Sequence, residues 1–418
     1  MVSSALLSTD NVYLGRQPIL DRSQSLYAFE LLFRTGAENK AHVICDIAAT
    51  SAVIVHTLSE FGIDVVLGRY TGFINCDASF LQSDAIELLP PEKIVLEILE
   101  KTIADEMILK RCIELKQYGF RLALDDFQGI TSQNQAFLDL MDIIKVDVLG
   151  LTRQELRNIV DQLSGRNIVL LAEKVETKDE FNFCLELGFD LYQGYFFSKA
   201  EKISGKRFTA GQQTVVQLLG MVQSDSDVNS VVEAFKQSPT LSIGLLRLTN
   251  SASIGLRHVV TSIRSAVVLL GHKQLQRWLL LLLMAQGGTR KGLQTALIHQ
   301  AAGRAKFMEL MAMSQREWEP YAESAFITGI VSVMDALLGM ETQVLVESLG
   351  LDVKVYDALT NRKGILGELL NLVEAMELDD MSKVTKFVDT ESKGNYESLI
   401  QAQGQMIAWV NQIIDTGI

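Results

Sequence analysis

The feature that most constrains the fold is a regular alternation of short apolar runs and amphipathic stretches between about residues 11 and 200. The runs are rich in Ile, Val, Leu and Phe, and they are Gly72–Asn75, Lys93–Glu97, Arg121–Asp126, Asp142–Asp147, Asn167–Glu173 and Phe189–Gly194. Between them, Ile103–Tyr118 and Thr152–Ser164 have apolar residues three and four positions apart, as helices do. Alternating strands and helices predict a parallel sheet with crossover helices.

Nearly every apolar run ends on an acidic or amide residue. These residues are Asn75, Glu97, Asp125, Asp126, Asp147, Glu173 and Gln193. The steps from Glu97 to Asp125, Lys145, Glu173 and Gln193 are 28, 20, 28 and 20 residues, about one strand-plus-helix unit each. In an α/β barrel all strand C-termini point to one face, and that face bears the catalytic residues. We therefore expect these distant side chains to converge.

The polar set has the composition of a metal site. Its hard oxygen ligands are Glu30, Asn75, Glu97, Asp125, Asp126 and Glu173, and no His or Cys recurs among them. Clustered carboxylates raise one another's pKa values unless a cation neutralises them. Oxygen ligands favour Mg²⁺, Mn²⁺ or Ca²⁺ over zinc. Two such ions would generate hydroxide and stabilise both reacting oxygens of a phosphodiester, and Lys145 could position the water or neutralise developing charge.

Each of these residues also has a structural interpretation. Glu97 and Glu100 could face solvent at a strand end, and Asp125-Asp126 could cap a following helix. Lys145 and Asp147 could form a surface ion pair of little consequence. For any one residue taken alone, the structural interpretation is preferred. For all of them taken together, at regularly spaced strand ends, we favour a metal site.

The same residues resemble, in order, the signature of the EAL domain, the cyclic di-GMP phosphodiesterase. The matching segments are Gln17–Ile19, Tyr27–Arg34, Asn75, Glu97–Glu100, Asp125–Phe127, Lys145–Asp147, Glu173–Glu176 and Gln193–Tyr195. The resemblance covers roughly residues 11–200. It implies a TIM-like barrel with one antiparallel strand, and opening of cyclic di-GMP to linear pGpG with two Mg²⁺ or Mn²⁺ ions.

The resemblance also implies a role for each matching residue. Metal ligands would be Glu30, Asn75, Glu97, Asp125 and Asp126. Glu173 would hold the second metal or its water, and Lys145 would serve the water as base or orienter. Contacts to nucleotide or phosphate would come from Gln17, Leu32, Arg34 and Gln193, while Glu100 and Glu176 would support neighbouring loops.

Four positions depart from the family pattern. Leu31 stands where the family has Ala, Lys174 where it usually has Gly, and Ala200 where it usually has Pro. The loop after the Asp pair has Gln128 in place of a Gly, and in the family this loop helps to organise the metals and a homodimer contact. These departures indicate a chemically equipped site with low activity. They motivate a second hypothesis, a catalytically weak or inactive cyclic di-GMP receptor or scaffold, and a weaker third, that both halves are interaction modules.

After about Lys206 the strand-like runs give way to helical periodicity, so we predict two domains, 1–205 and 206–418. The second, all-α domain resembles an HDOD domain in Ser238-Pro239, Leu245–Ala252, Thr261–Ile263, Leu269–Gly271 and Phe326–Ile330. The HD phosphohydrolases, which are related to the HDOD domain, need an adjacent His-Asp pair to bind metal. None of the five His residues in this chain is followed by Asp, so such a pair is absent. The resemblance implies a regulatory or protein-interaction domain that binds a protein partner.

Composition narrows the setting. Lys+Arg 38 against Asp+Glu 51 gives a net charge of −13, which argues against a nucleic acid polymer as partner. Cys45, Cys76, Cys112 and Cys184 have no CxxC spacing and are expected to be buried free thiols of a reducing compartment. The N-terminus lacks a signal peptide and the longest apolar run, Trp278–Ala285, is too short to span a bilayer, so we expect a cytoplasmic protein without a membrane partner.

Overall fold

The computed structural model describes residues 12–35, 62–196, 208–224, 226–250, 260–286, 291–378, 380–391 and 395–415. The chain forms two compact units, one of Met1–Lys199 with Leu372–Asn411 and one of Ala200–Asn371 with Gln412–Ile418. The predicted boundary between an EAL-like and an HDOD-like domain after residue 205 is not tested by this division into compact units, and it stays a prediction. The contacts between residues show one feature that the sequence did not indicate. Residues 372–411, near the C-terminal end, pack with the first unit.

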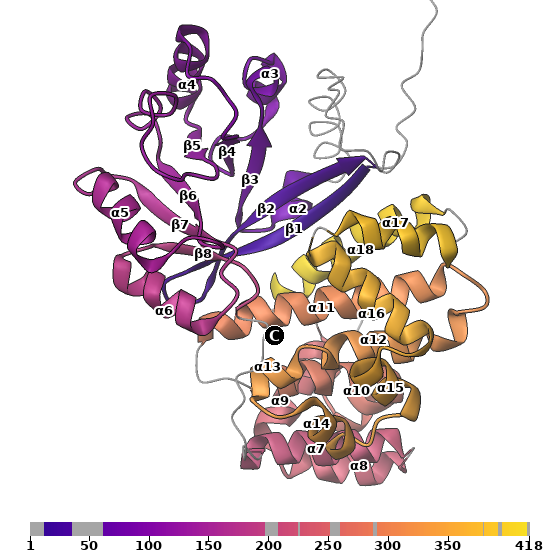
Figure 1. The fold of residues 1–418 in the computed structure, drawn as a ribbon. Coiled ribbons are helices and arrows are strands. Elements are labelled where there is room, and N and C mark those ends of the chain that lie inside the picture. The colour runs from indigo at the N-terminus through magenta and orange to yellow at the C-terminus, as the bar shows by residue number, and fades with distance from the viewer. Residues whose placement is uncertain are drawn as a thin grey trace, which may run out of the picture. The chain divides into compact units, whose positions relative to one another are not determined.

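The first unit contains a closed barrel of eight strands in sequence order (Figure 1). Its strands are β1 (Val12–Asp21), β2 (Leu26–Thr35), β3 (Thr71–Cys76), β4 (Ile94–Ile98), β5 (Arg121–Leu124), β6 (Ile143–Asp147), β7 (Val169–Glu173) and β8 (Leu191–Gln193). β1 is antiparallel to both of its neighbours, β2 and β8, and every other pairing is parallel. The predicted barrel with one antiparallel strand is therefore confirmed.

Helices connect and flank the strands of this unit. They are α2 (Ile63–Leu67), α3 (Ala78–Leu81), the 3₁₀ helix η1 (Asp84–Leu88), α4 (Glu106–Tyr118), α5 (Arg153–Leu163), α6 (Lys178–Leu187), α17 (Met381–Thr390) and most of α18 (Tyr396–Asp415). The crossover helices begin at side-chain caps: Asp105 caps α4, and Thr152 and Thr177 form capping boxes at α5 and α6. These local signals place each helix start next to the strand end that it follows.

One buried apolar residue from each strand fills the middle of the barrel. The eight residues are Ile19, Ala28, Phe73, Val95, Ala123, Ile143, Leu171 and Leu191. Side chains two positions apart on a strand point to the same face, so the residues two positions further toward the barrel mouth also point inward. This apolar layer forms the floor beneath the site.

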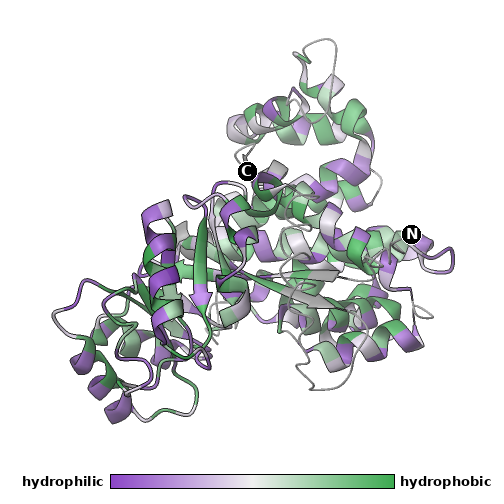
Figure 2. Cartoon of the chain, turned by 90° about the horizontal axis from the view of Figure 1, so that it is seen from above, coloured by the Kyte–Doolittle hydropathy of each residue, from purple (hydrophilic) through white to green (hydrophobic). Residues whose placement is uncertain are grey.

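The second unit is helical, as predicted. Its helices are α7 (Ala210–Gln223), α8 (Val228–Lys236), α9 (Pro239–Thr249), α10 (Ile263–Ala285), α11 (Lys291–Met313), the 3₁₀ helix η3 (Glu319–Tyr321), α12 (Ala322–Val331), α13 (Met334–Leu338), α14 (Thr342–Ser348), α15 (Val353–Asn361) and the first part of α16 (Gly364–Glu377). Non-helical torsions at Gly271 (φ 66°) interrupt α10. Hydrophobic and hydrophilic segments alternate along the helices (Figure 2).

Three further expectations can be compared with the structure. Cys76, Cys112 and Cys184 are buried free thiols, while Cys45 lies outside the described residues. Most of the Trp278–Ala285 run, which is too short to span a bilayer, is buried within α10. The stretch Glu319–Leu338 is apolar enough to cross a membrane, but 61% of it is buried inside the protein, so it is weak evidence for a span.

Candidate functional site

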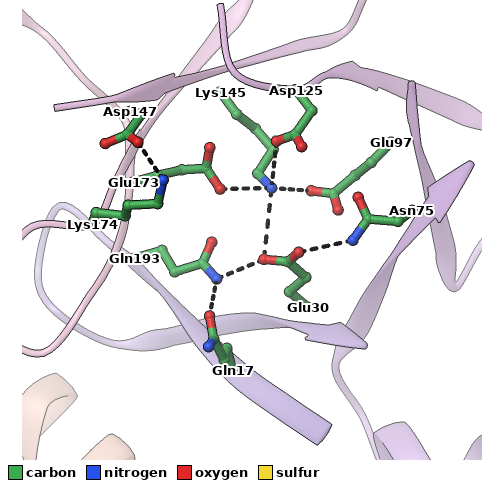
Figure 3. A network of polar contacts seen from close by, with 10 residues as sticks. All are labelled: Gln17, Glu30, Asn75, Glu97, Asp125, Lys145, Asp147, Glu173, Lys174 and Gln193. Carbon is green, nitrogen blue, oxygen red and sulfur yellow. Dashed lines mark hydrogen bonds and ion pairs between the residues drawn. The ribbon is translucent and has the colours of Figure 1, made fainter. Parts of the chain in front are cut away.

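A layer of polar side chains lies directly above the apolar floor of the barrel. It comprises Gln17, Glu30, Asn75, Glu97, Asp125, Lys145, Glu173 and Gln193, each two positions from the floor residue of its own strand. On the parallel strands these positions lie toward the C-terminal end; β1 is antiparallel, so Gln17 precedes Ile19 instead of following it. The predicted convergence is therefore present, with one contribution from every strand (Figure 3).

The Lys145 ammonium lies at the centre of this layer and is surrounded by four carboxylates (Figure 3). Its Nζ lies 2.6 Å from Glu97 Oε1, 2.7 Å from Glu173 Oε1, 3.0 Å from Asp125 Oδ1 and 3.6 Å from Glu30 Oε2. The Lys145 side chain is 1% exposed and that of Glu97 is fully buried. One ammonium group thus faces four carboxyl groups in a largely buried position.

Amide side chains fix the orientation of Glu30. Asn75 Nδ2 donates to Glu30 Oε1 at 3.1 Å, and Gln193 Nε2 donates to Glu30 Oε2 at 2.7 Å and to Gln17 Oε1 at 2.8 Å. Gln17 Nε2 donates in turn to the carbonyl oxygen of Glu377 at 3.1 Å, in the part of α16 that belongs to the same compact unit. Two predicted substrate-binding residues, Gln17 and Gln193, are therefore part of one network with a predicted metal ligand.

The electrostatics of the layer follow from burial and crowding. Burial, together with the neighbouring carboxylates, raises the pKa of Glu97 well above its usual value, although Lys145 opposes this. Burial also raises the pKa of Glu173, to about 7, against the opposing effect of Lys145, and repulsion from Asp125 and Glu30 adds to the rise. For Lys145, burial favours the neutral amine, but the four carboxylates outweigh burial and raise its pKa. Lys145 is therefore protonated at neutral pH in this arrangement.

The layer forms the base of a cavity of about 760 Å³. That volume is within the range of small-molecule sites. Besides the polar layer, the predicted site residues Leu32, Glu100, Asp126 and Glu176 line it. Arg34 lies in β2, but its side chain is outside the described part of the chain. Except for that side chain and the fully buried Glu97, every predicted site residue borders this cavity.

Most of the structural interpretations of single residues do not describe what is seen; Glu100 is the exception, because it is exposed, as that interpretation expects. Glu97 does not face solvent, since it is fully buried. Lys145 does not pair with Asp147; instead Asp147 accepts a bond from Lys174, and these two residues form an ion pair. No helix starts at Asp125-Asp126, because the residues after them form turns up to residue 140.

The residues fit a divalent cation in chemistry but are not arranged as ligands here. In the described part of the chain, no group of three or more His, Cys, Asp or Glu residues is positioned to hold one ion, since the carboxylates point at Lys145. Asn75 Oδ1, Glu97 Oε2 and Asp126 Oδ1 are buried oxygens without a hydrogen-bond partner. Buried unpaired oxygens in an acidic set are the donors that a hard cation requires. The residues therefore match a divalent cation in the type of their donor atoms. Binding of the cation would draw the carboxylates away from Lys145.

The altered loop after Asp126 is held in place by side-chain amides. Gln162 Oε1 accepts from Ile130 N at 2.9 Å, and Asn134 Nδ2 donates to the Gly129 carbonyl at 2.9 Å. Within the loop, positive φ angles occur at Asp126 (45°) and Gly129 (129°) but not at Gln128. The backbone therefore does not need glycine at 128.

Gly194 explains how Gln193 is positioned. A Cβ at Gly194 would lie 2.1 Å from the carbonyl oxygen of Val175, and its φ is 143°. Only glycine lets the end of β8 approach the β7 loop this closely. Gly194 belongs to the matching segment Gln193–Tyr195, but the close contact that requires glycine appears only in the structure.

Four cavity residues were not named in the sequence analysis, and they are Asp77, Phe80, Leu149 and Leu378. Six others were named without a ligand or substrate-binding role: Leu31, Leu99, Asp147, Lys174, Gly194 and Tyr195. Asp77, Phe80 and Leu149 follow a strand end by one to four residues, so a search of those positions would have found them. Leu378 had no such signal, because it follows α16 and is far from the barrel strands in sequence.

Both halves of the chain match known protein families. A family model of the EAL domain matches residues 1–200, and one of the HDOD domain matches residues 211–339. Cyclic di-GMP phosphodiesterase CdgJ of Vibrio cholerae is 35% identical over 89% of this chain and 86% of its own length. Uncharacterized protein YuxH of Bacillus subtilis is 31% identical over 97% of this chain and 99% of its own length.

Solved structures show weaker similarity. The YkuI protein of Bacillus subtilis, with an EAL domain and in complex with c-di-GMP and calcium, is 18% identical with a TM-score of 0.39. The match covers 63% of this chain and 72% of that one. At this score we draw no conclusion from the likeness.

Proposed function

The chain belongs to the family of proteins that join an EAL domain to an HDOD domain, and from this premise we propose that it hydrolyses cyclic di-GMP to linear pGpG. CdgJ, which shares 35% of its residues over most of both chains, is described as a cyclic di-GMP phosphodiesterase. The observation that supports the proposal most strongly is the complete polar layer, in which all eight strands place a side chain of the family motif at one mouth of the barrel.

The substrate would lie in the cavity above this layer. Its volume of about 760 Å³ suits a ligand of dinucleotide size. Gln17, Leu32, Arg34 and Gln193 are proposed to contact nucleotide or phosphate. Gln17 now donates to the Glu377 carbonyl, so its amide would exchange this partner for the ligand.

Glu30, Asn75, Glu97, Asp125 and Asp126 are proposed to hold two divalent cations, Mg²⁺ or Mn²⁺, with Glu173 at the second. The cations would neutralise the phosphodiester and activate the attacking water. The unpaired oxygens of Asn75, Glu97 and Asp126 support this assignment. Glu100 and Glu176 line the cavity and are proposed to support the adjacent loops.

Lys145 is proposed to orient the water and to stabilise developing negative charge. Of the two roles open to it, base and orienter, the second needs only a charged group at the centre of the layer, where Lys145 Nζ lies 2.6 Å from Glu97 and 2.7 Å from Glu173.

The test is incubation of the purified chain with cyclic di-GMP, with and without Mg²⁺ or Mn²⁺, followed by chromatographic separation of pGpG. We expect product only with the cation and strongly reduced product in Glu30→Gln. Lys110→Gln, on the exposed side of α4, is the matched control and should keep full activity.

Binding of the dinucleotide without any turnover would instead support the receptor or scaffold hypothesis. The hydrogen bonds of Gln162 and Asn134 hold the loop after Asp126 in place, which favours turnover over binding alone. Because the loop sequence departs from the family pattern, we expect a low rate.

The remaining assignments extend the proposal. The helical HDOD domain is proposed to bind a protein partner and to regulate the barrel, and a homodimer through the loop after Asp126 is proposed from the family pattern. A cytoplasmic location fits the substrate and the free thiols at Cys76, Cys112 and Cys184.

A further inference from the structure

Lys174 has a backbone conformation that is unusual for lysine. It follows Glu173, the last residue of β7, and its φ is 53°. A left-handed conformation is uncommon for residues other than glycine, asparagine and aspartate, and such strain is often found at functional sites. A glycine would adopt it more easily, so the side chain of Lys174 needs an explanation that the backbone does not supply.

The side chain of Lys174 lines the cavity and is accessible. Among the described residues that line it, the cationic side chains are those of Lys145 and Lys174. Lys145 is 1% exposed and engaged by four carboxylates, whereas the side chain of Lys174 is 60% exposed. In the described lining, Lys174 is therefore the ammonium group that a ligand in the cavity can reach.

The partner of Lys174 can be exchanged at low cost. Its ammonium group pairs with Asp147 Oδ2, while Asp147 Oδ1 accepts from Leu149 N at 2.8 Å. Asp147 is 19% exposed on its side chain, so it keeps one hydrogen bond and access to water when the ammonium group moves. The bond to Asp147 also raises the pKa of Lys174, which keeps the amine charged.

An anionic ligand needs such a group here. Eight carboxylate side chains line the cavity, and they repel a substrate with two phosphate charges. We propose that Lys174, positioned by its left-handed backbone at the end of β7, leaves Asp147 to bind a phosphate oxygen of the substrate. This inference rests on the proposed function for the identity of the ligand, and it assigns Lys174 to substrate binding rather than to the chemical step.

The test compares five variants with the wild type in steady-state hydrolysis of cyclic di-GMP. Lys174→Gln should raise KM about tenfold, the usual effect of losing a charged hydrogen bond, and should leave kcat within about twofold. Lys174→Arg should restore KM to within about threefold of the wild type. Lys110→Gln removes an equal charge away from the cavity and should change neither constant.

Asp147→Asn separates binding from a structural role. If Lys174 serves only to join β6 to β7 through Asp147, Asp147→Asn and Lys174→Gln have the same effect. Binding of phosphate by Lys174 predicts that Asp147→Asn leaves KM unchanged or lowers it, because the ammonium group is then free. Equal effects of the two variants, or a fall in kcat at constant KM, would overturn the inference.

Lys174→Gly gives a readout independent of catalysis. Since glycine relieves the left-handed strain, its melting temperature should be no lower than that of the wild type, while its KM rises as in Lys174→Gln. A lower melting temperature with unchanged KM would indicate that Lys174 is only structural.

Direct binding of cyclic di-GMP, measured by calorimetry, distinguishes failure of this inference from failure of the proposed function. Hydrolysis with unchanged KM in Lys174→Gln overturns the phosphate contact alone. Absence of hydrolysis, together with binding that weakens in Lys174→Gln, overturns the phosphodiesterase and supports the contact. Absence of binding by the wild type overturns the contact.

Discussion

Each unit of the molecule contains a group of buried and half-buried charged residues, and the two groups differ in their balance of charge. In the barrel, one ammonium group of Lys145 faces four carboxylates (Figure 3). In the helical unit, Arg277 lies 2.5 Å from Glu309 and 2.6 Å from Glu323, and Lys306 lies 2.8 Å from Glu309. Two cations there meet two carboxylates.

The difference shows which group is built for stability and which for chemistry. The Arg277 guanidinium also stacks over Phe326, 4.2 Å from the ring centre, so its apolar face is packed as well. The barrel group instead has an excess of negative charge and the unpaired buried oxygens Glu97 Oε2 and Asn75 Oδ1. An excess of buried charge costs stability, so its presence indicates a cation or ligand that it is meant to receive.

The largest expected effect is on catalysis and tests the barrel group. Lys145→Ala should lower kcat about 10³-fold, because it removes the one charged donor at the centre of the layer. The measurement is pGpG formation at saturating substrate and Mn²⁺. Circular dichroism with Mn²⁺ present checks that the variant folds, and a kcat equal to that of the wild type would remove Lys145 from the chemistry.

The matching change in the helical unit should affect stability and not catalysis. Arg277→Met leaves Glu309, 7% exposed on its side chain, without its main partner and should lower the free energy of unfolding by about 3 kcal/mol. Urea denaturation followed by tryptophan fluorescence measures this. A loss of kcat as large as that in Lys145→Ala would show that the two groups do not differ as described.

A smaller effect is the stabilisation by a divalent cation, which should depend on the barrel group and not on the group around Arg277. Mn²⁺ at about 100 times its Kd should stabilise the wild type by about 2.7 kcal/mol, seen as a rise in melting temperature. Glu97→Gln should lose most of this rise, because it removes a buried charged oxygen donor. Glu309→Gln, in the balanced group, should keep the full rise; equal losses in both variants would place the cation elsewhere.

The smallest effect concerns pH in the metal-free protein. The pKa of Glu173 is about 7 in the folded chain against 4.5 normally, so folding favours its protonated form. Its contribution to stability is therefore complete below pH 4.5 and is lost as the pH rises to about 7 and above. The stability of the wild type relative to Glu173→Gln should fall over this window, measured by thermal melting at several pH values. A constant difference from pH 5 to pH 8 would contradict the raised pKa.

The sequence predicted the layer of polar residues because strand structure is local. A period of two fixes which side chains share a face, and the runs ending at Glu97, Lys145 and Glu173 were recognisable from their own composition. Parallel strands with crossover helices then required these ends to meet on one side. The parallel strands with crossover helices and the helical second half followed from patterns within a few tens of residues, whereas the closed barrel with one antiparallel strand was implied by the resemblance to the EAL domain.

Contacts between side chains of different strands could not be predicted in this way. A surface ion pair of Asp147 with Lys145, two residues away, was the structural alternative considered from the sequence, but the partner of Asp147 is Lys174, 27 residues away. Only the register of β6 against β7, together with the left-handed turn at Lys174, sets that distance. Likewise, no local pattern places Glu377 against Gln17, 360 residues earlier. The sequence by itself determined which residues reach the barrel mouth, and closure of the barrel decided which of them touch.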